Sequence, residues 1–151
     1  MRKIDWNVLL PEETSLVSVV WMSYGDEWKG KVGASLYDWY TIAAWVNGGG
    51  NAGHNVMLNW IKVHFHELPW ASIHAKIIYL WQWKVINITN IEKERQQLAA
   101  SRLSPTIMIA WWAHVVIPAV HKTLEQIIED SKNGHNKIWS TFTWIGPSYG
   151  L

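Results

Sequence analysis

Glycine and proline interrupt this chain at short intervals, and the interruptions limit how long any helix or strand can be. The main ones stand at Pro11, Gly25, Gly48, Pro69, Pro105 and Gly134. The segments between them have lengths typical of helices in globular proteins. The sequence therefore predicts an all-α fold, a single helical domain over residues 1–151 with about six helices.

Local signals place these helices. The expected helices span residues 11–25, 33–46, 54–68, 70–88, 92–103 and 105–132. The segment that follows Trp70 carries apolar residues at helical spacing, namely Ile73, Ile77, Trp81, Val85 and Ile88. Thr89 and Glu92 have the spacing of a capping box, and Ser104-Pro105 is typical of a helix start.

Two segments also fit strands. Apolar residues at 61, 63 and 65 alternate with Lys62, His64 and His66, and residues 77–89 are rich in β-branched and aromatic side chains. The sequence leaves helix and strand open for segments 60–67 and 77–89.

Composition excludes several classes of protein. The chain has no cysteine, which rules out disulfides, thiolate metal sites and cysteine nucleophiles. Its net charge of +1 comes without clustered Lys or Arg, so nucleic acid is not an expected partner. The longest apolar run, residues 107–120, is shorter than the roughly 20 residues that cross a bilayer. Other apolar stretches contain Lys62, Lys76, Lys84 and Glu67. We expect a soluble, cytoplasmic protein without a membrane span.

The usual catalytic motifs are absent, so we expect no enzyme. No Gly-x-Ser-x-Gly nucleophile motif is present. The glycine-rich stretch from Gly48 to Gly53 lacks the Lys-Ser/Thr of a phosphate-binding loop, and we interpret it as a helix end followed by a flexible connection. His66-Glu67 resembles half of a zinc-protease motif, but Trp70 stands where the second histidine is needed.

Histidine and tryptophan supply the candidate ligand-binding residues. His64 and His66 could chelate a metal if they lie on a strand, where they would share one face. His114 and His121 would share a helix face and could hold a metal or a porphyrin, or be ordinary core histidines. The thirteen tryptophans fill a core or an interface, or wall a pocket for a flat ligand, for which Trp81 and Trp111 mark the candidate clusters.

Several fragments resemble vertebrate-type globins, in the expected order. They are Leu9 to Trp21, Gly25 with Gly33, Ala34 and Leu36, His74 to Ile78, Leu98 to Pro105, and Pro118 to Ile128. The resemblance implies a globin-like fold, or failing that an irregular helical bundle, that binds heme for gas binding or sensing. It places His74 on the distal side of the heme, with His64 as the alternative.

The sequence departs from the globin pattern at the iron ligand. Ala99 stands where the proximal histidine is expected, and Phe65 and Phe142 are the only phenylalanines. His114 is then the candidate axial ligand. The predicted cofactor site consists of His74, His64, His114, Trp81 and Trp111, with His114 and His74 as metal ligands. The competing hypothesis is a helical structural or interaction protein, such as an assembly subunit or a designed helical domain, whose Trp-rich surfaces pack against copies of itself or against a partner. The ligand of the first hypothesis is a small, flat, apolar molecule.

Overall fold

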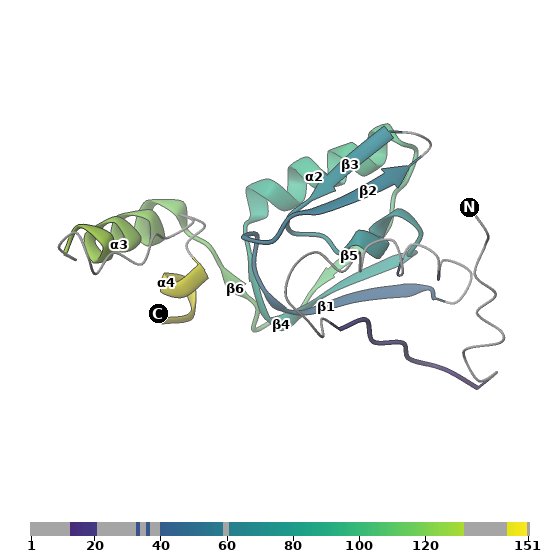
Figure 1. The fold of residues 1–151 in the computed structure, drawn as a ribbon, viewed down its shortest axis with the longest axis horizontal. Helices are drawn as coiled ribbons and strands as arrows, with labels where there is room; N and C mark the ends of the chain where they lie inside the picture. The colour runs from purple at the N-terminus through teal and green to yellow at the C-terminus, as the bar shows by residue number, and fades with distance from the viewer. Residues whose placement is uncertain are drawn as a thin grey trace.

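The chain forms a mixed α/β fold around a parallel sheet (Figure 1). This computed structural model describes residues 13–20, 33, 36, 40–58, 61–131 and 145–150. Strands β1 (Ile42–Gly48), β4 (Ile77–Ile86) and β5 (Thr106–Ile109) lie parallel in the order β1-β4-β5, and the short β6 (His114–Val115) pairs with the end of β4. The predicted all-α fold of about six helices is therefore wrong.

A hairpin follows β1. Strands β2 (His54–Leu58) and β3 (Ile61–Phe65) pair antiparallel, and the 3₁₀ helix η2 (Trp70–Ile73) leads into β4. The strand alternatives for segments 60–67 and 77–89 are thus confirmed over 61–65 and 77–86. Their β-branched and aromatic residues favour strands, and pairing with partners distant in sequence decides the outcome.

Three helices are described, and two of them overlap predicted ones. Helix α2 (Ile88–Ala100) connects β4 to β5, α3 (Pro118–Asp130) begins at a proline, and α4 (Ile145–Gly150) is a short C-terminal helix. Asn87 caps α2, since its Oδ1 accepts from the backbone N–H groups of Thr89 and Asn90 at 3.1 and 3.4 Å. The capping residue is therefore Asn87, not Thr89.

Most described residues of the other predicted helices are not helical: helices 33–46, 54–68 and 70–88 are replaced largely by β1, the hairpin and β4, although Gly33 is helical and η2 covers Trp70–Ile73. Residues 11–12, 21–25, 34–35 and 37–39 of the predicted helices lie outside the described residues. Residues 14–20 have no regular structure, and residues 106–109, predicted to be helical, form β5. No helix in the described ranges is long and apolar enough to cross a membrane.

The core lies on one side of the sheet, beneath the hairpin and α2 (Figure 1). Ile78 and Leu80 of β4 are fully buried there against Phe65 of β3 and Leu98 of α2. This packing holds the end of the hairpin against β4.

Candidate functional site

The glycine-rich loop follows the carboxyl end of β1. Gly48, the last residue of β1, pairs with Lys84 of β4 and has a φ of +79°, a conformation that favours glycine. The loop then reaches β2 at His54. The interpretation of this stretch as a helix end is therefore wrong, because it joins two strands. In open α/β sheets, ligands bind outside the carboxyl ends of parallel strands.

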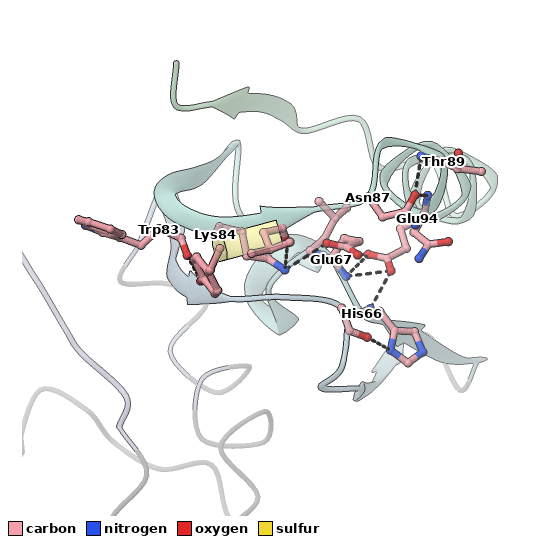
Figure 2. A network of polar contacts seen from close by, with 12 residues as sticks. His66, Glu67, Trp83, Lys84, Asn87, Thr89 and Glu94 are labelled. Carbon is pink, nitrogen blue, oxygen red and sulfur yellow. Dashed lines mark hydrogen bonds and ion pairs between the residues drawn. The ribbon is translucent and has the colours of Figure 1, made fainter. Parts of the chain in front are cut away.

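A buried ion pair lies beneath this loop (Figure 2). Lys84 Nζ donates to Glu67 Oε2 at 3.1 Å and to the carbonyl of Val85 at 3.2 Å, and it lies 4.4 Å from the centre of the Trp45 ring. The two charged side chains are 0% and 2% exposed. A Cβ atom at residue 50 would lie 2.4 Å from Glu67 Oε1, so the loop needs glycine at this position.

Burial opposes charge on both members of the pair. It raises the pKa of Glu67, although Lys84 and a hydrogen bond from the Asn87 backbone act in the other direction. It likewise lowers the pKa of Lys84 against the opposing effects of Glu67 and Glu94. The attraction between the two charges therefore offsets a large desolvation cost.

Glu94 of α2 holds the chain that leaves β3. Its carboxylate accepts hydrogen bonds from the backbone N–H groups of three successive residues, His66 at 2.7 Å, Glu67 at 3.0 and 3.1 Å, and Leu68 at 2.8 Å (Figure 2). Three donors on one buried carboxylate fix the backbone from which Glu67 reaches Lys84.

Histidines surround the other side of the loop. The Nδ1–H of His66 donates to the Gly50 carbonyl at 3.1 Å, and the rings of His66 and His64 lie 4.4 Å apart. His54, at the start of β2, packs its ring edge-on to Trp45 at 4.8 Å. The loop is thus bordered by three imidazoles and by the buried ion pair.

The two predicted tryptophan clusters, residues 81–83 and 111–112, both contribute to a cavity separate from the loop. A cavity of about 190 Å³ is lined by Gln82, Trp83, Trp112 and His114. The Nδ1 atom of His114 is buried there without a hydrogen-bond partner among the described residues, and its ring lies 5.1 Å from that of Tyr149. Trp81 and Trp111, the residues predicted to line such a pocket, are instead 42% and 89% exposed beside it.

The residues predicted to bind heme or a metal lie on different elements of the structure. His74 is exposed in the turn after η2, His64 lies on β3, and His114 lies on β6. His121 lies on α3, where its Nδ1 accepts from the Ile117 backbone at 2.8 Å, so it does not share a helix face with His114. Within the described residues, no three His, Asp or Glu side chains form a group that could hold a metal.

Sequence reasoning did not single out His54 or the pairing of Glu67 with Lys84. Glu67 and Lys84 were visible only as charges inside apolar stretches, which is the one signal that pointed to a buried pair. His54 directly follows the glycine-rich loop, but that position indicates a site only once the loop is placed between strands.

Comparisons with known proteins identify the family. The family model for adenylosuccinate synthetase matches residues 18–151. The adenylosuccinate synthetase of Enterococcus faecalis is 34% identical over 137 residues, which cover 89% of this chain and 31% of that protein. The enzyme of Picrophilus torridus is 34% identical over 131 residues, which cover 87% of this chain and 31% of that protein. The chain therefore spans about a third of the length of these relatives.

Solved structures agree with this fold. The fully ligated adenylosuccinate synthetase of Plasmodium falciparum superposes with a TM-score of 0.68 at 29% identity, over 84% of this chain and 30% of that one. The succinoaminodeoxyadenylate synthetase of cyanophage S-2L superposes with a TM-score of 0.61 at 19% identity, over 80% of this chain and 33% of that one.

These matches overturn the globin resemblance and what it implied. Among the globin-like fragments, His74 to Ile78 runs into β4, whereas Leu98 to Pro105 contains the end of α2 and Pro118 to Ile128 lies in α3. Parts of the first two fragments, residues 9–12, Trp21, Gly25 and Ala34, lie outside the described residues. Heme as cofactor, gas binding and the non-enzymatic helical alternative lose their support, because the relatives are enzymes with an α/β fold. The match over residues 18–151 covers most of the sequence, and this chain belongs to the adenylosuccinate synthetase family.

Proposed function

We propose that this chain provides the part of an adenylosuccinate-forming enzyme that holds a nucleotide at the loop between β1 and β2. The family match over residues 18–151 carries the proposal. Because the relatives are about three times as long, the complete reaction requires segments of the family fold that this chain does not match. We also propose a cytoplasmic location, which the cysteine-free sequence suits.

The geometry of the loop supports nucleotide binding. The product named by the family, adenylosuccinate, is a purine nucleotide with a phosphate group and two carboxylates. Backbone N–H groups of a glycine-rich turn can approach such anions closely, because no side chains intervene. Lys62 and His54 stand on the neighbouring hairpin, and their side chains are candidate donors for the same anions.

Binding of adenylosuccinate to the purified chain tests this proposal. Resonances of residues 48–54 are expected to shift in a heteronuclear NMR titration with adenylosuccinate. Gly50→Ala should abolish these shifts, because the added methyl group displaces the Glu67 carboxylate. Gly146→Ala is the matched control, since a Cβ atom there meets nothing within 4 Å.

Two outcomes of this titration would contradict the proposal. If adenylosuccinate shifts no resonance of residues 48–54, or if Gly50→Ala and Gly146→Ala bind it equally, the loop does not hold the nucleotide. A test of the whole activity uses bacteria that lack their own adenylosuccinate synthetase. Mass spectrometry should detect adenylosuccinate when this chain is expressed with the unmatched two-thirds of the E. faecalis enzyme, but not with either part alone.

A further inference from the structure

His64 and His66 lie side by side on the outer face of the hairpin. They are two residues apart at the end of β3, so their side chains project from the same face. Their rings are 4.4 Å apart from centre to centre, with an angle of 80° between the ring planes. The opposite face of β3 carries the buried side chains of Val63 and Phe65.

Each imidazole is oriented by a hydrogen bond through the same ring atom. The Nδ1–H of His64 donates to Oδ1 of Asn55, its cross-strand partner, at 2.7 Å. The Nδ1–H of His66 donates to the Gly50 carbonyl at 3.1 Å. In both rings the proton is therefore on Nδ1, and the lone pair is on Nε2. Carbonyl oxygens fix metal-binding histidines in this way.

The outer edges of both rings face the same point above the loop. A Cβ atom at residue 53 would lie 2.8 Å from Cε1 and 3.0 Å from Nε2 of His64, and 3.2 Å from Cε1 of His66. Gly53 therefore leaves open the space toward which these edges converge. An alanine at this position would fill that space.

We propose that His64 and His66 bind one divalent first-row transition-metal ion, such as Cu²⁺, Ni²⁺ or Zn²⁺, through their Nε2 atoms. Metal–nitrogen bonds of about 2.0–2.1 Å are compatible with rings at this separation after small side-chain rotations. Imidazole nitrogen suits these ions, whereas Mg²⁺ and Ca²⁺ require oxygen ligands. Water completes the coordination, so the site is open to a further ligand.

The direction in which the pKa of His64 shifts agrees with this geometry. Shielding from water lowers the pKa of His64, and the neighbouring His66 and Lys62 lower it further. A neutral ring is the form that coordinates a metal. The inference does not depend on the proposed function, because metal binding is measured without nucleotide.

Cu²⁺ alone is the probe that tests the site. Electron paramagnetic resonance of the Cu²⁺-loaded protein should show two nitrogen donors, and isothermal titration should give one site. His64→Ala and His66→Ala should each leave at most one nitrogen donor and weaken binding by more than about tenfold. Asn55→Ala keeps both ligands but removes an orienting acceptor, so we expect a loss of roughly 10–100-fold.

Two control variants separate this site from other histidines and from loss of folding. His74→Ala removes an exposed histidine on another element and should leave the affinity unchanged. Gly53→Ala should weaken Cu²⁺ binding while the circular dichroism spectrum stays that of the folded protein. Cu²⁺ affinity that is equal in the parent protein, His64→Ala and His66→Ala would overturn the proposal, as would a spectrum with a single nitrogen donor in the parent.

Discussion

At the scale of single residues, the Glu67–Lys84 pair is the most consequential feature of the candidate site. Both groups are removed from water and lie 3.1 Å apart, beneath a loop that is in contact with Glu67. The desolvation of such a pair often equals or exceeds the attraction between its charges. The pair therefore adds little net stability, and its contact joins the segment after β3 to β4.

Removing one partner should cost far more than removing both. Lys84→Met leaves a buried carboxylate without its counter-charge, and we expect unfolding in urea to require about 3–5 kcal/mol less free energy than in the parent. The double variant, which adds Glu67→Leu, should recover most of that loss because no buried charge remains. Glu92→Ala is the control, since it breaks an exposed pair with Arg95. If Lys84→Met is no less stable than Glu92→Ala, the pair is not buried as described.

At the scale of elements, α2 connects the core to the candidate site through Glu94. The carboxylate reaches from the buried side of α2 to three backbone donors at residues 66–68. Hydrogen bonds to a charged acceptor contribute about 1.5–3 kcal/mol each to stability. Residues 66–68 in turn contact the loop between β1 and β2 through His66 and Glu67. The position of this loop therefore depends on α2, a helix that lies far from it in the sequence.

Glu94→Gln should loosen this connection. An amide has one acceptor oxygen, so its nitrogen would face backbone N–H groups that can no longer donate. We expect a loss of about 2–4 kcal/mol in the free energy of unfolding. Faster amide hydrogen exchange at residues 66–68 should accompany it. Lys93→Gln, at the exposed neighbouring position, should change neither quantity. Unaltered exchange at residues 66–68 in Glu94→Gln would show that the carboxylate does not hold them.

The sequence could predict only those elements that local sequence signals specify, such as helix propensity or a proline at a helix start. Most of α2 was expected from its helix propensity, and part of α3 was expected from the segment after Pro118. The segment of β4 was predicted to be helical, with a strand left open as the alternative, because its apolar residues recur every four positions. Residues four apart share one face of a helix, but also one face of a strand. In β4 the core-facing residues are Ile78 and Leu80, not the Ile77 and Trp81 of the helical pattern.

Part of the candidate site was visible in the sequence and part was not. The same-face arrangement of His64 and His66 was expected if they lay on a strand, and the structure confirms that arrangement. The glycine-rich stretch was noticed but misplaced, because its meaning depends on the strands at both its ends. The contact of Glu67 with Lys84 spans 17 residues of sequence and depends on tertiary packing, which no local pattern encodes.

At the scale of the whole molecule, one face of the parallel sheet carries exposed apolar side chains. The covered face packs against the hairpin and α2, whereas the other face presents Ile42, Val46, Trp81 and Met108, which are 56%, 53%, 42% and 49% exposed. Sheets of parallel strands are normally buried on both faces. Since the family relatives are about three times as long, we infer that other segments of the family fold cover this face.

A binding experiment with the unmatched two-thirds of the E. faecalis enzyme tests that inference. The two polypeptides should copurify when expressed together, because association removes the exposed apolar face from water. Trp81→Ser or Val46→Ser should reduce the copurified amount by about tenfold or more, which corresponds to roughly 1.4 kcal/mol of lost binding free energy. Ile127→Ser is the matched control, because Ile127 is 57% exposed but lies on α3, away from the sheet. Equal copurification of all three variants would place the contact elsewhere. Self-association of this chain that Trp81→Ser abolishes would assign the face to a second copy instead.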